Sequence, residues 1–470
     1  MVSDAARRNV LIAAVTGSSL APFMVSAIIV ALPAIADEFS ADGVTLGWLA
    51  SVFFLAAAVF LVPFGRVADR YGAKKVFLAG LGVYAASAVL SLLAPDIRVL
   101  IAARFLTGIG GGMIFGTSIA LLSLAFPESE RGRAIGINVT GMFVGFLLGF
   151  FLGGLLTYYL SWRGIFLVVL PVALAAMGLI LLRIRGECEI SRAGALDAPG
   201  MALYALSMLL LMTGFSSLSV PAGEVIFAAG VVVLLLFILR ELRAGSPALD
   251  VRLFARNAIF ARANLAALVF NTSNFAVIFL LSLYLQDIRG FDARVSGIIL
   301  LTLVVCMAAF SSFAGRLSDR TAPALVIGTG VALSTAGLAI LAFIAPDTSV
   351  IVLVAALAVM GTGFAFFQSP LIRTLVGSVP RELYGRASGM VETMRLVGMT
   401  ISIAIATLVL GTFVGSSHIG PDVSARFIEA IHAIFWIFLG LSLAALVVVI
   451  FLGRQQGVPG KGPGKEEPRK

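Results

Sequence analysis

The chain has 470 residues, of which 60% are apolar and only 12% are charged, and its mean hydropathy is +1.08. Soluble domains are nearer half apolar and a quarter charged, so this composition excludes an ordinary soluble enzyme. The formal net charge of +9 does not indicate a nucleic-acid-binding protein, because the basic residues are spread over short segments between apolar runs.

Fourteen apolar runs follow one another along the chain, and a helix needs roughly 20 such residues to cross a bilayer. The runs are continuous rather than alternating, which indicates helices and not the strands of a barrel. The expected spans are residues 10–35, 46–64, 76–94, 99–123, 134–157, 164–183, 198–217, 223–240, 261–285, 295–314, 323–344, 348–371, 386–412 and 428–452. We therefore expect an all-α polytopic membrane protein with fourteen transmembrane helices.

The charges of the connecting segments predict the orientation of these helices. An even number of spans places both termini on one side, and 26 of the 33 Lys and Arg residues fall in the segments on that side. Five fall on the other side, and Arg104 and Arg395 lie inside spans. By the positive-inside rule, we expect both termini in the cytoplasm and the protein in a plasma or inner cell membrane.

Two motifs recur at nearly the same offset, which indicates two parallel halves. The segment 65–70 (GRVADR) recurs 250 residues later as GRLSDR, and 132–136 (GRAIG) recurs 253 residues later as GRASG. Each motif is expected in a cytoplasmic loop, and the offset equals eight spans. The expected domains are an N-terminal six-helix bundle (1–190), two inserted helices with a linker (191–257), a C-terminal six-helix bundle (258–453) and a disordered cytoplasmic tail (454–470).

The loop around Asp69 carries a family resemblance. Its pattern of Gly65, Asp69, Arg70 and Gly72, ending at Lys75, resembles the signature loop of the major facilitator superfamily. Further motifs are similar to those of its fourteen-helix drug:proton antiporter family, namely Arg104-x-x-x-Gly108, Trp162-Arg163 with Pro171, and Tyr284-Leu285-Gln286. The resemblance implies the major facilitator fold and a secondary transporter that alternates between two access states.

The chain also departs from the family pattern. Met24 stands where the family has an acidic residue in the first span, and Phe150 replaces the proline of the fifth-span motif. Thr107 stands where the fourth span has a Gln. Because of these departures, a function other than the exchange of drugs for protons stays open.

The predicted gate lies in the cytoplasmic loops. The resemblance implies that Asp69 latches this face through Arg386 or a helix end near span 13, and the alternative is a solvated charge that only sets topology. Arg70, Gly65, Gly72 and the repeated Asp319 belong to the same prediction. Glycines at every fourth residue of span 5 predict either close helix packing or a sliding gate surface, and the gate candidates there are Gly145, Gly149, Gly153 and Gly154.

Ionisable residues inside spans are expensive and therefore point to function. Glu392 and Arg395 lie three residues apart in span 13, so they are expected to pair, either as a structural ion pair or with Glu392 as the proton or substrate site. Arg104 in span 4 could bind an anionic group, snorkel outward or bridge helices. Polar and aromatic stripes give the candidates for the cavity wall, with interhelical hydrogen bonding as the alternative: Ser19, Phe23, Met24, Ser26, Asn271, Asn274, Phe367 and Gln368.

Other functional classes find no support in the sequence. There is no phosphate-binding loop for an ATP-driven pump, and with two histidines and two cysteines there is no metal-ligand cluster for an enzyme. We expect a proton-coupled exporter of small amphipathic or drug-like compounds. It should need an ion gradient but no cofactor, and a lipid bilayer but no obligatory protein partner. The alternatives are a facilitator or antiporter for a specific metabolite or organic anion, bound by Arg104 and Arg395, and a related receptor or sensor without transport.

Overall fold

The computed structural model of the chain describes residues 4–183, 197–218, 221–244, 251–380, 384–415 and 423–456. Within these ranges the chain is almost entirely helical, and fourteen helices are long and apolar enough to cross a membrane. The expected all-α polytopic architecture is therefore confirmed, with every expected span matched by a helix.

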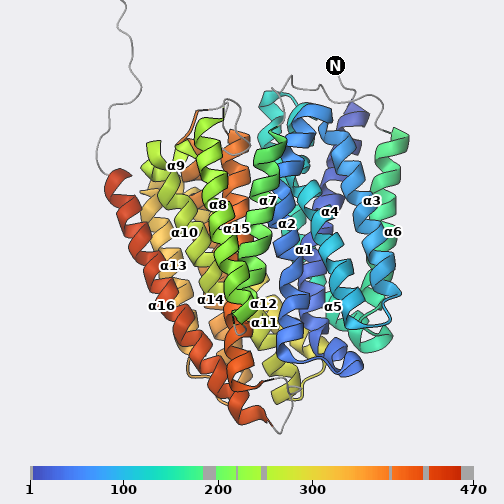
Figure 1. Cartoon of the computed structure of the whole chain (residues 1–470), viewed down its shortest axis with the longest axis vertical. Coiled ribbons are helices and arrows are strands. Elements are labelled where there is room, and N and C mark those ends of the chain that lie inside the picture. The colour runs from blue at the N-terminus through green and yellow to red at the C-terminus, as the bar shows by residue number, and fades with distance from the viewer. Residues whose placement is uncertain are drawn as a thin grey trace, which may run out of the picture.

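Two bundles of six spans stand side by side (Figure 1). The N-terminal bundle contains α1 (Asp4–Phe39), α2 (Gly43–Tyr71), α3 (Ala73–Leu92), α4 (Ile97–Ala125), α5 (Glu128–Leu160) and α6 (Gly164–Arg183). The C-terminal bundle follows a short helix, α9 (Arg252–Arg256), and its first span is built from α10 (Ala258–Asn274), α11 (Ala276–Leu283) and the π-helical turn η1 (Tyr284–Ile288). Its other spans are α12 (Ala293–Arg320), α13 (Pro323–Leu341), α14 (Val350–Gly377), α15 (Tyr384–Phe413) and α16 (Ser424–Gln456).

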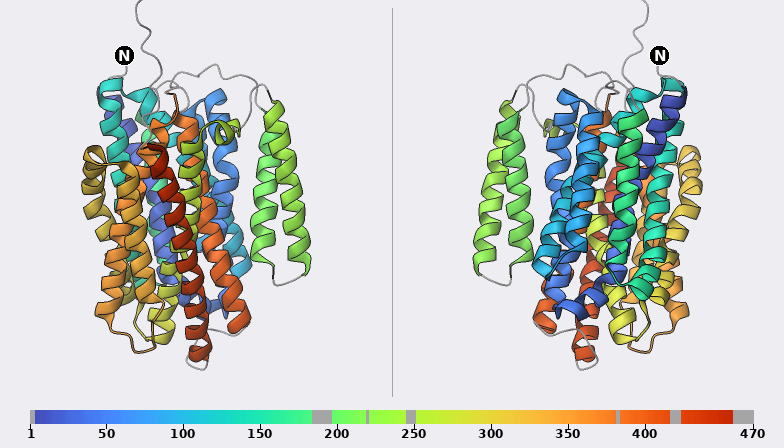
Figure 2. Two further views of the ribbon diagram at one scale, coloured as in Figure 1. Left: turned by 90° about the vertical axis from the view of Figure 1, so that its left-hand side faces the viewer. Right: turned by 90° about the vertical axis from the view of Figure 1, so that its right-hand side faces the viewer.

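The two inserted helices, α7 (Ala198–Ser216) and α8 (Pro221–Arg243), form a hairpin at one side of the molecule in both views of Figure 2. The hydroxyl of Tyr204 in α7 donates to the carbonyl of Ala58 in α2 at 2.8 Å. At the start of α7, the carboxylate of Asp197 accepts from the amide of Gly200 and from Arg240 of α8, at 3.0 and 2.6 Å. The hairpin therefore contacts the N-terminal bundle through α2. The ion pair of Asp197 and Arg240 joins its two helices at the end opposite their connecting turn.

The two ends of the molecule differ in the side chains that they carry. The end at which α1 begins and α2 ends, uppermost in Figure 1, is called the basic face because Arg70, Lys74 and Lys75 lie there. The opposite end, at which α1 ends and α2 begins, is called the distal face. Two helices that begin at the distal face, α2 and α4, are capped by aspartates: Asp42 accepts from the amide of Thr45 at 2.8 Å, and Asp96 accepts from that of Arg98 at 2.8 Å.

The helices extend beyond the apolar runs, and this corrects the expected loop positions of the repeated motifs. Asp69 lies in the last turn of α2 and Asp319 in the last turn of α12, rather than in loops. The second motif begins α5 in one half and α15 in the other. Hydropathy locates the part of a helix in the apolar core, whereas backbone hydrogen bonding continues through charged residues until a residue such as Gly72, with φ +103°, ends it. Similarly, α16 runs through Arg454 to Gln456, and the rest of the expected tail lies outside the described residues.

Candidate functional site

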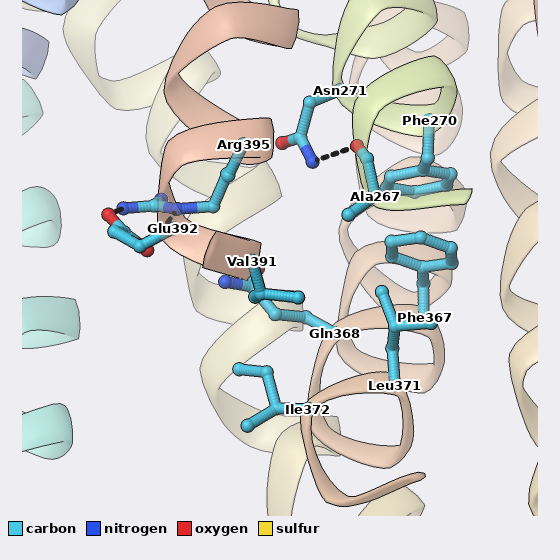
Figure 3. Close-up of a pocket in the computed structure, with 10 residues that line it drawn as sticks. All are labelled: Ala267, Phe270, Asn271, Phe367, Gln368, Leu371, Ile372, Val391, Glu392 and Arg395. Carbon is cyan, nitrogen blue, oxygen red and sulfur yellow. Dashed lines mark hydrogen bonds and ion pairs between the residues drawn. The ribbon is translucent and has the colours of Figure 1, made fainter. Parts of the chain in front are cut away.

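A small cavity lies in the C-terminal bundle between α10, α14 and α15 (Figure 3). Its volume is about 20 Å³, which is room for about one water molecule. Three of the residues expected in a cavity wall line it, together with both members of the predicted ion pair: Asn271, Phe367, Gln368, Glu392 and Arg395. The structure therefore brings these five candidates from three helices into one site.

The predicted pair in α15 forms. Nε of Arg395 donates to Oε2 of Glu392 at 2.9 Å, and a second bond joins Nη2 to Oε1. The side chains retain 20% and 23% of their exposure, so the pair is neither fully buried nor freely solvated. A charge-assisted, two-bond arrangement of this kind fixes both side chains and leaves the site with no net charge while Glu392 is ionised.

The opposite wall of the cavity is aromatic. The ring of Phe270 in α10 stacks on that of Phe367 in α14, with centroids 3.8 Å apart and planes at 14°. Phe364 meets Phe270 edge-on at 4.9 Å. Figure 3 shows the stacked rings on one side of the site and the ion pair on the other, so the wall offers an apolar surface facing a polar one.

Two amides lie between these walls. Asn271 donates to the carbonyl of Ala267 in its own helix at 2.8 Å, which orients its side-chain oxygen away from that carbonyl (Figure 3). Gln368 follows Phe367 in α14 and lines the same cavity. Amides beside a charged pair and stacked rings suit an amphipathic solute, because each part of such a molecule meets a matching surface.

Arg104 is in a different place from this cavity. It is 1% exposed in α4, which rules out outward snorkelling, and its guanidinium lies 5.2 Å from the ring centroid of Phe53. Among the residues that the structure describes, its Nε and Nη1 have no hydrogen-bond partner. A buried cation without a carboxylate partner is costly, and no ion pair joins this guanidinium to a carboxylate of the described residues.

The remaining wall candidates lie in helix contacts rather than in the wall of this cavity. Ser19 donates to the carbonyl of Thr16, and Ser26 donates across to the carbonyl of Phe146 in α5, both at 2.8 Å. Phe23 and Met24 are buried in the core of the bundle. In the other half, Asn274 is 1% exposed and donates to the carbonyl of Phe270 in its own helix, at 2.9 Å.

The glycines of α5 explain why α1 comes so close. A Cβ at Gly145 would strike the carbonyl of Ser19, and one at Gly149 would strike that of Phe23. At Gly153 it would lie 2.6 Å from Cα of Ala27. These three positions therefore pack within the N-terminal bundle, as the close-packing alternative expects.

Gly154 faces the other way and belongs to the contact between bundles. Its Cβ would lie 2.6 Å from the carbonyl oxygen of Ala293 at the start of α12. Nearby, Gly297 of α12 packs on the carbonyl of Phe150. The two glycines allow α5 and α12 to meet backbone to backbone at the distal face.

Side chains outside the predicted set complete this contact, which we call the distal seam. Ser282 donates to the carbonyl of Ile29 at 2.7 Å, and Gln286 donates to that of Val30 at 3.0 Å. Arg294 reaches Tyr159 of α5 at 3.2 Å and Asp292 at 3.0 Å. A hydrogen bond from Arg294 holds the pKa of the Asp292 carboxyl below its ordinary value.

Sequence reasoning could have found only part of the seam. Gln286 stands in the motif that carried the family resemblance, and Ser282 falls on the same polar stripe of its span as Asn271, whereas Arg294 looks like an ordinary loop cation. Their partners are backbone carbonyls and a tyrosine of the other half, which no pattern within one helix reveals. The seam closes the distal side of the interface between the bundles.

The predicted latch at the basic face is described only in part. Asp69 and Arg70 are exposed, and the Arg70 guanidinium lies 5.8 Å from the ring centroid of Tyr71. The side chain of Arg386 lies outside the described residues, so its pairing with Asp69 stays a prediction. The repeated Asp319 forms an ion pair with Arg373 of α14, within its own bundle.

Comparison with known proteins identifies the family. A family model described as the Major Facilitator Superfamily matches residues 14–403 and, in a second match, 265–470. The chain belongs to the major facilitator superfamily. Membership confirms the resemblance drawn from the signature motif, and it explains the repeated halves and the helical, multi-pass architecture.

Three relatives from the superfamily cover most of the chain. The multidrug resistance protein Stp of Mycobacterium tuberculosis (strain CDC 1551 / Oshkosh) is 31% identical, over 87% of this chain and 78% of its own. The cephamycin export protein CmcT of Amycolatopsis lactamdurans is 29% identical, over 94% and 90%. The riboflavin transporter RibZ of Clostridioides difficile (strain 630) is 23% identical, over 91% and 93%.

A solved structure shares the fold. A bacterial homolog of the human lysosomal transporter Spinster, in an inward-facing and unoccupied conformation, superposes with a TM-score of 0.69 at 16% identity. The match covers 96% of this chain and 98% of that one. Major facilitator transporters move small molecules across membranes and are not enzymes, and this chain has their family pattern and their fold.

Proposed function

We propose that this major facilitator transporter exports small amphipathic compounds in exchange for protons. The observation that carries the proposal is the ion pair of Glu392 and Arg395 set opposite the stacked rings of Phe270 and Phe367. A proton and the polar part of a solute can both compete for the carboxylate, and a competition for one site is what exchange requires. The names of Stp and CmcT support drug-like or antibiotic solutes.

Alternating access supplies the mechanism in this proposal. The distal seam is closed here by the hydrogen bonds of Ser282 and Gln286, and opening it requires those bonds to break while the basic face closes. The closed seam and the small cavity then represent one end of the cycle. We further propose that the basic face is cytoplasmic, from the distribution of charges, and that the domain boundaries are those expected from the repeat.

Reconstitution tests this proposal. Liposomes containing the protein are loaded with a cationic amphipathic dye, and its movement is followed under an imposed pH gradient, for wild type and for Glu392→Gln. We expect gradient-driven movement that Glu392→Gln abolishes. Glu224→Gln in α8, an exposed carboxylate remote from the cavity, serves as the matched control and keeps full activity. Movement unchanged by Glu392→Gln would remove Glu392 from the coupling mechanism.

A second candidate function rests on Arg104. Its buried guanidinium lacks partners at Nε and Nη1, so an anionic solute could supply what no carboxylate of the described residues does. In that case the protein carries an organic anion, and the riboflavin transporter RibZ shows that related chains are not all named for drug export. Uptake of an aromatic carboxylate into the same liposomes, abolished by Arg104→Gln and indifferent to the pH gradient, would favour this function.

A further inference from the structure

A second hollow opens at the distal face, where the turn from α1 to α2 meets the start of α4. Its volume is about 450 Å³, far larger than the cavity beside Glu392. It lies in the N-terminal bundle and shares no residue with that cavity, so it is a separate feature of the surface. No step of the proposed transport mechanism uses it.

The walls of this hollow combine three kinds of surface. Phe39 and Trp48 supply aromatic faces, and Ile97 and Ile101 supply an aliphatic strip one turn apart along α4. Arg98 and Asp42 supply one positive and one negative charge at the same rim. An occupant that satisfies all of these carries both charges on a small polar head and has an apolar body.

Each of the two charged side chains has hydrogen-bonding groups available for such a polar head. Asp42 uses Oδ1 to cap α2 through the amide of Thr45, which leaves Oδ2 for another donor. The guanidinium of Arg98 is exposed, and among the described residues no hydrogen bond holds it, because Asp96 binds only the backbone amide of that residue. A guanidinium recognises phosphate, and a carboxylate recognises an ammonium group that can donate hydrogen bonds.

The depth of the hollow identifies the medium from which the occupant comes. Both α2 and α4 have 29 residues, so each is about 43 Å long. That length matches a bilayer with its headgroup layers, roughly 40–45 Å, and exceeds the hydrocarbon core of about 30 Å. The apolar runs begin at residues 46 and 99, so the first turns of α2 and α4 lie at the edge of the apolar core, where a tryptophan beside an arginine is typical of the membrane interface.

From these observations we infer that the hollow is a binding site for a phosphatidylethanolamine molecule of the adjacent leaflet. Arg98 binds its phosphate, Asp42 accepts from its ammonium group, and the glycerol and first acyl carbons lie on Trp48, Ile97 and Ile101. The bound lipid contacts Trp48 near the start of α2, next to Gly47, which packs on Thr407 of α15 in the other bundle. This inference stands apart from the proposed function, since it requires neither export nor proton exchange.

The experiment measures lipid binding directly on the purified full chain. Delipidated protein in detergent is titrated with short-chain phosphatidylethanolamine, and the thermal unfolding midpoint and native mass spectra report saturation. We expect Arg98→Gln and Asp42→Asn each to weaken binding about fivefold, the effect of one charge near a membrane surface. Asparagine caps a helix as well as aspartate does, so Asp42→Asn removes the charge and keeps the fold.

Three controls decide the assignment. Arg426→Gln, an exposed arginine at the distal start of α16, should bind the lipid as wild type does. Phosphatidylcholine, whose ammonium group cannot donate a hydrogen bond, should bind to wild type more weakly than phosphatidylethanolamine does. The two lipids should bind equally well to Asp42→Asn. The inference is overturned if Arg98→Gln and Asp42→Asn bind phosphatidylethanolamine as tightly as wild type, or if soluble glycerophosphoethanolamine protects as well as the lipid.

Discussion

Arg395 places Nε 2.9 Å from Oε2 of Glu392, one turn away along α15, and the pair forms one wall of the cavity. The carboxylate is therefore neutralised from within its own helix, without help from the other bundle. Opening the seam between bundles need not break this pair. A proton or a solute that reaches Glu392 competes instead with Arg395 for the carboxylate.

Removing one partner should cost more than removing both. Arg395→Gln leaves a half-buried carboxylate unpaired and should lower the free energy of unfolding by about 1–3 kcal/mol. The double variant Glu392→Gln/Arg395→Gln should recover most of that loss, because neither charge remains. Thermal unfolding of wild type, Glu392→Gln, Arg395→Gln and the double variant in one detergent measures the coupling. Additive losses would show that the two side chains act independently.

The glycines of α5 that face α1 should tolerate no methyl group. Gly149→Ala places a Cβ against the carbonyl of Phe23 and should destabilise the protein by about 1–3 kcal/mol, because α1 must move away. Gly136→Ala is the matched control in the same helix, since nothing lies within 4 Å of its Cβ. It should be neutral or slightly stabilising. Equal effects of the two substitutions would contradict the close packing of α1 on α5.

Gly154→Ala should act on the conformational equilibrium rather than on packing within a bundle. Its Cβ meets the carbonyl oxygen of Ala293 at 2.6 Å, so the distal seam cannot close fully. Spin labels at the distal ends of α5 and α12 should report a longer mean distance than in wild type. Gly153→Ala, which presses on α1 instead, should leave that distance unchanged, and a shift of equal size there would argue against a role for Gly154 in the seam.

Replacing Arg104 should affect the stability of the protein and its transport activity differently. Arg104→Met replaces an unsatisfied buried cation by an apolar side chain, so stability should stay the same or rise by about 1–4 kcal/mol. Solute flux should fall at least tenfold if the guanidinium serves transport. Unfolding midpoints and liposome flux measured on the same preparation test both halves of this prediction. A large loss of stability would instead make Arg104 a structural residue.

The distal seam should respond to acid. Because the hydrogen bond from Arg294 lowers the pKa of Asp292 below its usual 3.8, the pair adds stability above the unfolded pKa and loses it as pH falls through the folded pKa. Asp292→Asn should therefore lower the unfolding midpoint at pH 7, and this effect should shrink as the pH falls below 3.8 and disappear below the folded pKa. Asp96→Asn provides a control carboxylate at the same face that caps a helix without binding a cation. A difference of the same size at every pH, including pH values below the folded pKa, would show that the cap of α12, and not the ion pair, is responsible.

The sequence predicted the helices far better than their contacts. Apolar length alone located all fourteen spans, since the bilayer imposes nearly the same requirement on each one. The pairing of Glu392 with Arg395 could also be predicted, because three residues along a helix bring side chains together. Asp69 was wrongly placed in a loop, since the charge pattern marks the edge of the membrane and not the end of the helix.

Contacts between helices were beyond the reach of pattern reasoning. In sequence, Ser26 and Asn274 both look like residues of a polar cavity wall. In the structure, Ser26 donates to a backbone carbonyl of α5, whereas Asn274 donates to a backbone carbonyl of its own helix. Which way a polar side chain turns depends on how close the neighbouring helix comes. For α1 that distance was set by glycines more than a hundred residues away.

This separation has a consequence for the making of the protein. The hydroxyl of Ser26 and the carbonyl of Phe146 are 120 residues apart, and ribosomes add about 5–20 residues per second. The first helix therefore waits roughly 6–24 s in the membrane before its partner has been synthesised. During that interval Ser26 can donate to the carbonyl of Pro22 at 3.0 Å, within its own helix. Once α5 has been inserted, the Ser26 hydroxyl can donate to Phe146 instead of to its own helix, and this hydrogen bond then joins two distant segments of the chain.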